Sequence, residues 1–206
     1  MTHWAVLACA LSASPMLFAQ PAQRAATKAR PPKVSTTATC AAELGAGASS
    51  GRRFCDVIVA TKPAESIAIT IPPRRGTARL LFDLHNRVAV PPDTRQSAQT
   101  FTRNSAIVSV LGPKGEIGRG AAVSEFRTVA DLFDRISGGP AGGVKAVGPG
   151  SATPVDVTIP AGITTIGIVG VRLEVVTRLG KQMYDTPGRP IAIVSNLRVE
   201  YTPTGR

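Results

Sequence analysis

The apolar residues of this chain recur with a period of two from Phe54 onward, which is the pattern of β-strands that bury one face. Residues 66–71 alternate strictly, the segment PPRRG at 72–76 forms a turn, and 78–84 alternate again. We therefore expect a strand, a turn and a second strand. Further strands are predicted at 101–111, 116–123, 155–159, 163–176 and 191–201.

Two strands carry features that refine this pattern. In the apolar run 163–176, Gly167 and Gly170 would permit a bulge or the close approach of another backbone. In the closing strand, apolar residues at odd positions predict one buried face, with Ser195 as its polar member; they are Ile191, Ile193, Leu197, Val199 and Tyr201.

One segment has the period of a helix instead. Thr128 is a possible N-cap, Asp131 follows three residues later, and Gly138 is a typical C-terminal stop. Four apolar residues between them fall at i, i+3, i+4 and i+7: Val129, Leu132, Phe133 and Ile136. The sequence thus predicts one short helix near 128–137, followed by a long glycine-rich loop over 138–150.

Short strands at regular spacing with a single helix favour an all-β fold, an antiparallel β-sandwich, with a partly open β-barrel as the second choice. An α/β fold would require helices that alternate with the strands, and the pattern shows one helix.

The N-terminal region differs in composition from the rest of the chain. Residues 1–20 resemble a cleaved signal peptide, with a cleavage site near 19–23, although no Lys or Arg precedes the apolar run. Residues 21–39 hold four basic residues, three prolines and no acid, which predicts a disordered basic linker. We expect a single domain over 40–206, no membrane span in the mature chain, and a secreted or periplasmic location in a bacterial envelope.

Removal of the signal peptide would leave two cysteines, Cys40 and Cys55. In an oxidising compartment two cysteines at this spacing predict a disulfide. A metal site would need further ligands, and a thiol nucleophile would need His85, the one histidine outside the signal peptide.

The chain is strongly basic, with 24 Lys and Arg against 13 Asp and Glu, a formal net charge of +11. This charge fits contact with anionic envelope polymers or lipid headgroups, while compositional bias with charge that serves solubility is the simpler interpretation. The only tryptophan, Trp4, leaves with the signal peptide, so few aromatic residues remain to stack bases or sugars. We expect no nucleic-acid partner.

Candidate chemistry is concentrated in the segment LLFDLHNR at 80–87. In a strand, Asp83, His85 and Arg87 share one face while Asn86 points to the other. An ordinary solvated strand face would produce the same spacing, so these three are weak catalytic candidates. No G-x-S-x-G elbow, H-E-x-x-H motif or calcium loop occurs, and we predict no metal or cofactor.

The sequence therefore predicts a secreted β-sandwich module that acts by binding or structurally and is not an enzyme. Its partner would be an anionic envelope polymer, or another protein that pairs with a sheet edge. The alternative is a small periplasmic hydrolase that uses the polar strand face around His85.

Overall fold

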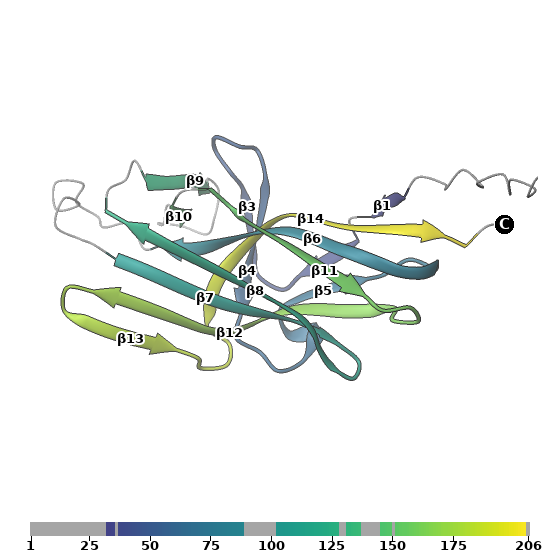
Figure 1. The fold of residues 1–206 in the computed structure, drawn as a ribbon. Helices are drawn as coiled ribbons and strands as arrows, with labels where there is room; N and C mark the ends of the chain where they lie inside the picture. The colour runs from purple at the N-terminus through teal and green to yellow at the C-terminus, as the bar shows by residue number, and fades with distance from the viewer. Residues whose placement is uncertain are drawn as a thin grey trace, which may run out of the picture. The chain divides into compact units, whose positions relative to one another are not determined.

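A computed structural model describes residues 32–35, 37–88, 102–127, 131–136, 145–149 and 151–204. The all-β prediction is confirmed, because two antiparallel sheets pack against each other (Figure 1). The predicted signal peptide and most of the predicted glycine-rich loop lie outside the described residues. The strands are β1 (Lys33–Ser35), β2 (Ala38–Cys40), β3 (Glu43–Ala46), β4 (Arg53–Ile58), β5 (Ile67–Thr70), β6 (Arg74–Val88), β7 (Thr102–Gly112), β8 (Gly115–Phe126), β9 (Leu132–Ile136), β10 (Lys145–Pro149), β11 (Thr153–Ile159), β12 (Thr165–Thr177), β13 (Gly180–Tyr184) and β14 (Pro190–Pro203).

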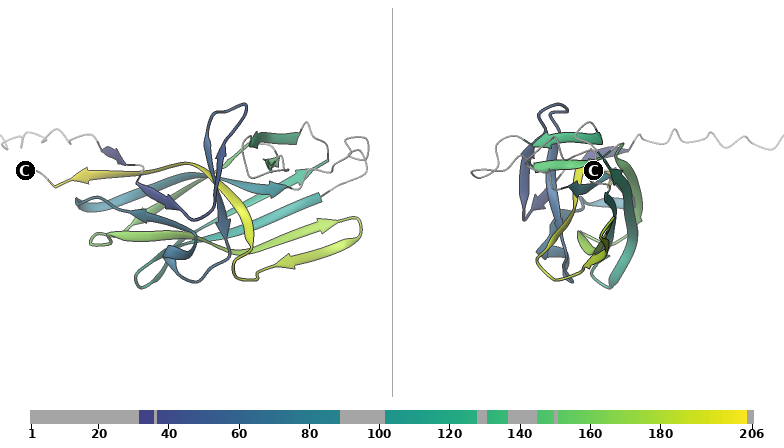
Figure 2. Two further views of the ribbon diagram at one scale, coloured as in Figure 1. Left: turned by 180° about the vertical axis from the view of Figure 1, so that it is seen from behind. Right: turned by 90° about the vertical axis from the view of Figure 1, so that its left-hand side faces the viewer.

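The two sheets differ in size. The larger has eight strands in the order β3-β4-β14-β6-β10-β9, with β1 paired to β14 and β11 paired to β6. The smaller has six strands in the order β2-β5-β12-β7-β8, with β13 paired to β12. The two layers lie face to face in the right-hand view of Figure 2, which is turned by 90° from Figure 1. This arrangement is the predicted sandwich and not the barrel that was the second choice.

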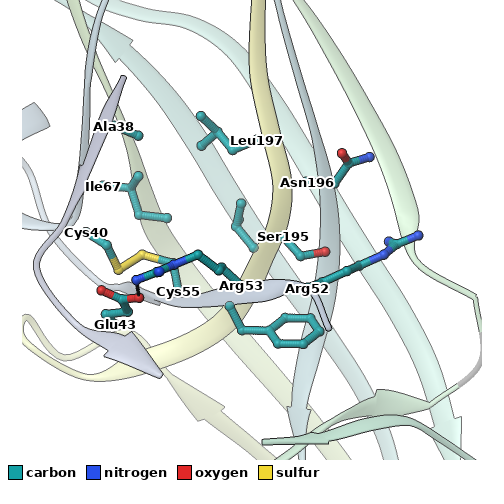
Figure 3. Close-up of a pocket in the computed structure, with 12 residues that line it drawn as sticks. Ala38, Cys40, Glu43, Arg52, Arg53, Cys55, Ile67, Ser195, Asn196 and Leu197 are labelled. Atoms are coloured by element: carbon teal, nitrogen blue, oxygen red, sulfur yellow. Dashed lines mark hydrogen bonds and ion pairs between the residues drawn. A yellow bond between two sulfur atoms is a disulfide. The ribbon is translucent and has the colours of Figure 1, made fainter. Parts of the chain in front are cut away.

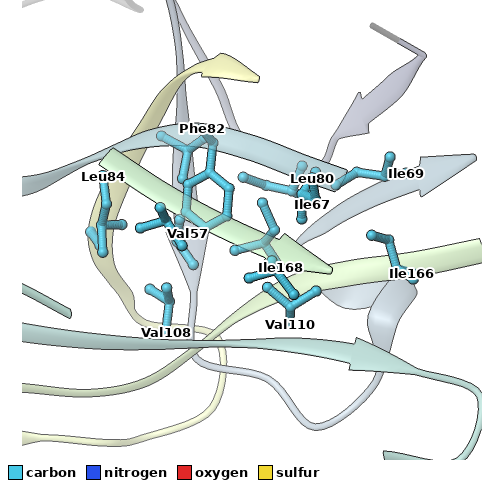
Figure 4. Packing of buried hydrophobic residues seen from close by; sticks show 14 of the residues in the cluster. Val57, Ile67, Ile69, Leu80, Phe82, Leu84, Val108, Val110, Ile166 and Ile168 are labelled. Atoms are coloured by element: carbon cyan, nitrogen blue, oxygen red, sulfur yellow. The ribbon is translucent and has the colours of Figure 1, made fainter. Parts of the chain in front are cut away.

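The main core fills the space between the sheets, as the alternating pattern predicts. Leu80, Phe82 and Leu84 of β6 point into it and are almost fully buried (Figure 4). From the smaller sheet, Ile166 and Ile168 of β12 meet them. Burial of each such side chain stabilises the fold by roughly 1.5–3 kcal/mol. The period of two therefore sets which face of each strand turns inward.

A second, smaller cluster covers the outer face of the larger sheet at one end. It consists of Leu44, Phe54, Ile136, Val147 and Ile193, with Phe133 packed against them. The sheet folds back here, because Gly47 forms an isolated antiparallel bridge with Ile136 and the Ala48 amide donates to the Arg135 carbonyl at 2.7 Å. At this end the larger sheet is buried on both faces.

Two irregularities in β14 divide its side chains between the two clusters. The register shifts between Pro190 and Ala192 and again between Ser195 and Arg198. Ile191 and Leu197 consequently pack in the main core, whereas Ile193 belongs to the outer cluster. The prediction that the odd positions of this strand share one face is therefore wrong for Ile193 and Ser195, because each bulge inserts a residue and reverses the alternation. It is right for the other four members, which pack in the main core: Ile191, Leu197, Val199 and Tyr201.

The predicted helix near 128–137 is also wrong where the structure describes it. Leu132–Ile136 is the strand β9, which pairs with β10. Asp134 and Ile136 are buried and Arg135 between them is exposed, so the segment follows a period of two. The Asp131 carboxylate accepts the Arg127 amide at 2.9 Å and does not cap a helix. Thr128 lies outside the described residues.

The predicted linker over 21–39 extends too far toward the domain. Within it, β1 pairs with the end of β14, and β2 pairs with β5. The disordered interpretation is wrong for residues 33–35 and 38–39, because their backbone groups are held in sheet ladders. Residues 21–31 lie outside the described part of the chain.

The glycines of β12 have the role that the sequence predicts. A Cβ on Gly167 would lie 2.7 Å from the Pro63 carbonyl carbon, in the short 3-10 helix Pro63–Glu65 that packs across the strand. The register of β12 against β7 shifts between Gly170 and Arg172. Gly167 thus permits a close backbone approach, and Gly170 lies at a bulge.

The predicted disulfide is present between Cys40 and Cys55, with 6.1 Å between the two Cα atoms. Cys40 ends β2 in the smaller sheet, and Cys55 lies in β4 of the larger sheet. The bond therefore joins the two layers at one edge of the sandwich.

We expect replacement of both cysteines (Cys40→Ser, Cys55→Ser) to lower the free energy of unfolding by about 3 kcal/mol, because the bond closes a loop over a sequence separation of 15 in the unfolded chain. Urea denaturation followed by circular dichroism measures this loss. A reducing agent should destabilise the natural chain and leave the double variant unchanged; equal stability of the two proteins under oxidising conditions would contradict the prediction.

Candidate functional site

The three residues singled out in the sequence lie together on the outer face of β6. Leu80, Phe82 and Leu84 point to the main core, so Asp83, His85 and Arg87 point the other way, as predicted. The face is not simply solvated, because His85 is only 3% exposed beneath the outer cluster. The structure therefore places the histidine in a buried polar environment.

His85 is held by a hydrogen bond and by aromatic packing. Its Nε2 atom lies 2.9 Å from Ser195 Oγ of the neighbouring β14. The ring contacts Phe54 edge-on at 5.6 Å and Phe133 at 4.6 Å between ring centroids. Burial lowers the pKa of His85 from 6.5 to about 4, against the Asp83 charge, which raises it, and together with the Arg52 charge, which lowers it. The imidazole is neutral at neutral pH.

The residues on either side of His85 are ion-paired. Asp83 accepts from Arg52 at 2.7 Å and from the Asn196 side-chain amide at 3.3 Å. Arg87 pairs with Asp56 of β4, with 3.5 Å between Arg87 Nε and the carboxylate. We call these three pairs the polar row: Asp83 with Arg52, His85 with Ser195, and Arg87 with Asp56.

Asn86, on the opposite face of β6, ties the two sheets together. Its amide nitrogen donates to Ser124 Oγ at 2.7 Å and to the Ala122 carbonyl at 3.2 Å, both in β8. Only 2% of Asn86 is exposed, so these bonds satisfy its amide nitrogen, whereas its Oδ1 atom is buried without a hydrogen-bond partner among the described residues. Asn86 is structural and does not extend the polar row.

Asp134, a buried carboxylate that the sequence did not single out, attaches β9 to the turn at Ser49 and Ser50. Asp134 accepts hydrogen bonds from the Ser49 and Ser50 amides at 3.0 and 2.9 Å, and from Ser50 Oγ at 2.5 Å. Burial raises the pKa of Asp134, but these bonds and one from the Arg135 amide outweigh it and lower the pKa to about 2. A Cβ on Gly47 would lie 2.8 Å from Asp134 Cγ, so only glycine fits there.

Next to the polar row lies a groove of about 640 Å³, between the β2–β5 edge of the smaller sheet and strands β4 and β14 of the larger (Figure 3). Its interior is apolar: Ile67 and Val194 are almost fully buried beneath it, and the disulfide is half-buried. Arg53 and Glu43 form an exposed ion pair at its rim. The lining residues are Ala38, Cys40, Glu43, Arg52, Arg53, Phe54, Cys55, Ile67, Val194, Ser195, Asn196 and Leu197.

The backbone of β14 is irregular where it borders the groove. Asn196 has a φ of 52°, the only positive φ of a non-glycine residue in the described chain. Such a conformation is unfavourable by about 1–3 kcal/mol and occurs preferentially at functional sites and bulges. Asn196 lies between the last pair with β4, at Ser195, and the first pair with β1, at Val199. Asparagine tolerates this conformation, but the sequence contains no signal that a bulge occurs here.

The fold and the site define a class of protein: a two-layer antiparallel β-sandwich with an inter-sheet disulfide and an edge groove beside a buried polar row. Compared with protein-family models, curated proteins and solved structures, the chain matches none of them. Across the described ranges, no set of three or more His, Cys, Asp or Glu is arranged to bind a metal ion. The same residues contain no helix of the length and apolarity that a membrane span requires.

The buried His85 makes stability depend on pH. Its pKa in the folded chain is about 4, below the 6.5 of the unfolded chain, so the unfolded state binds the proton first. We expect the stability from this group to be complete above pH 6.5 and to fall by about 3 kcal/mol as the pH drops to 4. Urea denaturation at a series of pH values measures the slope.

The matched variant is His85→Gln, which keeps an amide that can bond to Ser195 and removes the titration. Its stability should change much less between pH 6.5 and 4, even if it is lower throughout. Asp134 contributes its stability above its ordinary pKa of 3.8 and loses it mainly below that pH, as its pKa in the folded chain is about 2, so it changes little within this window. The same slope in both proteins would show that another group is responsible.

Proposed function

We propose that this protein is an exported, non-catalytic binding module and that the groove between β2, β5, β4 and β14 is its binding site. The observation that carries the proposal is the groove itself, in which an apolar interior and a rim with two arginines occur together. Ligand sites are typically cavities of about 300–1,000 Å³ with apolar walls and a few polar groups. The irregular backbone of β14 at Asn196, which borders the groove, adds support.

Export is supported by the disulfide and by the N-terminal pattern. A disulfide that joins two sheets persists in an oxidising compartment, and residues 1–20 have the composition of a signal peptide. In this proposal the basic segment 21–31 separates the cleavage site from the domain. The mature protein would then act in the periplasm or outside the cell.

The lining residues indicate the chemistry of the ligand. Leu197 and the half-buried disulfide offer apolar surface, and Arg52 and Arg53 offer guanidinium groups near the opening. Both arginines already have carboxylate partners, Asp83 and Glu43, and they keep donors free because a guanidinium has five. A ligand with an apolar body and an anionic group fits this arrangement. Anionic envelope polymers are ligands of this kind, and the net charge of +11 would attract them to the protein.

Reversal of one rim charge tests the groove. We expect Arg53→Glu to reduce retention of the protein on isolated cell envelopes at low salt by several-fold, because it removes a donor and repels an anionic ligand. The measurement is the bound fraction after centrifugation, at low and at high salt.

Arg119→Glu is the matched control. Arg119 is also exposed and also paired with a glutamate, Glu116 at 2.9 Å, but it lies in β8 away from the groove. Both variants lower the net charge by two, from +11 to +9. An equal loss in both would mean that retention follows overall charge and would remove the support for the groove.

A second candidate function, a small hydrolase, is favoured by one observation. Ser195 Oγ lies 2.9 Å from Nε2 of the neutral His85, the distance between a nucleophile and its general base, and Ser195 lines the groove. Against it, Ser195 is only 1% exposed, and Asp83 is already paired with Arg52 and does not orient the imidazole. The same hydrogen bond satisfies two buried polar groups in a purely structural role.

A fluorophosphonate probe, which labels activated serines, separates the two functions. The binding module should remain unlabelled, and a panel of ester substrates should be turned over equally by the natural chain and by Ser195→Ala. Labelling that disappears in Ser195→Ala and in His85→Gln would establish the hydrolase and overturn the non-catalytic proposal.

A further inference from the structure

The hairpin of β12 and β13 ends in a turn whose most prominent side chain is apolar. Leu179 is 100% exposed, the most exposed large hydrophobic residue of the described chain. The hairpin projects at the lower left of Figure 1, at the end of the smaller sheet. The fold buries none of this leucine, so its whole apolar surface is available to a partner that would remove it from water.

The turn is well ordered by its own hydrogen bonds. Thr177 pairs with Gly180 across the hairpin, and the Leu179 amide donates to Thr177 Oγ1 at 3.1 Å. Gly180 supplies the positive φ of 131° that the turn requires. None of these bonds uses the Leu179 side chain, so the conformation of the turn does not require a leucine at this position.

Cationic residues surround the exposed leucine. Arg178 and Lys181 flank the turn, and Arg103 of the adjacent β7 lies opposite Val176. Lys181 is paired with Glu174 at 2.5 Å. Within the described residues, Arg178 and Arg103 form no ion pair, so their charges remain available to an anionic partner.

The apolar character continues from the tip along one face of the hairpin. Met183 of β13 lies opposite Glu174 and is 49% exposed, and Val176 is two residues further along the same face and partly buried. Side chains at these positions point in the same direction because they alternate with the core-facing Val175 and Tyr184. The tip thus combines an apolar end with cations on both sides.

We propose that this hairpin tip, Arg178–Lys181 with Met183, docks on an anionic phospholipid bilayer and inserts Leu179 among the lipid headgroups and upper acyl chains. Charge complementarity favours a membrane, because Arg178 and Arg103, which form no ion pair within the described residues, would meet lipid phosphates while the leucine leaves water. A soluble anionic polymer would use the cations and gain nothing from Leu179. The tip belongs to strands that do not line the groove, so this inference stands independently of the proposed function.

A tryptophan at the tip reports insertion directly. In a chain with Trp4→Phe, Leu179→Trp places the only tryptophan at the turn, and Val123→Trp places it at an exposed site in β8 as the control. With phosphatidylcholine vesicles that contain phosphatidylglycerol, the emission of the Leu179→Trp variant should shift to the blue and be quenched by acyl-chain-brominated lipid. The Val123→Trp variant should show neither effect, and pure phosphatidylcholine should give little response in the Leu179→Trp variant.

Co-sedimentation with the same anionic vesicles tests the leucine and the charges separately. Leu179→Ser should weaken binding about tenfold, the loss expected when one leucine side chain no longer leaves water, and Arg178→Glu should weaken it similarly at low salt. Val123→Ser should bind as the natural chain does. Unchanged binding in Leu179→Ser, an unshifted emission spectrum in Leu179→Trp, or self-association through the tip in light scattering would overturn the proposal.

Discussion

The pairing of β6 with β14 is the constraint on which the rest of the structure depends. These are the two longest strands of the larger sheet, 15 and 14 residues, and they run side by side through its centre. Leu80, Phe82 and Leu84 on the inner face meet the smaller sheet, and at one end the outer face is covered as well. A strand pair that is buried on both faces has no solvated side on which to place polar residues, so each polar residue there needs a partner.

The polar row follows from this constraint. Asp83, His85 and Arg87 each meet a complementary group from β14, β4 or the turn before β4, and the histidine loses its charge because burial penalises the protonated form. Asp134 is also buried and also has partners, because its carboxylate accepts hydrogen bonds from the Ser49 and Ser50 amides. Residue types that resemble a catalytic cluster in the sequence are therefore explained by cross-strand satisfaction of buried polar groups.

The sequence predicts those features that depend on local periodicity. The period of two identifies the strands and the inward face of β6, and the cysteine count identifies the disulfide. Features that depend on contacts between residues far apart in the sequence cannot be predicted from local periodicity. The apolar residues of β9 coincide with a helical spacing, but their burial is decided by β10 and by the Asp134 hydrogen bonds. The bulge at Asn196 leaves no pattern either, because it arises from how β14 passes from β4 to β1.

Some polar and apolar groups are fully used in contacts within the fold, and others are not. The unused groups indicate where the molecule can bind a partner. A ligand gains little at the polar row, because the hydrogen bonds of His85 and Ser195 would have to be broken and replaced. The bulge at Asn196 leaves its side chain exposed beside an apolar groove, and the tip of the β12–β13 hairpin exposes Leu179 between cations. Interaction free energy is available at these two places, because each exposes apolar surface or donors that the fold itself does not use. Function is therefore expected at the edges of the sandwich, and the buried centre serves to hold those edges in place.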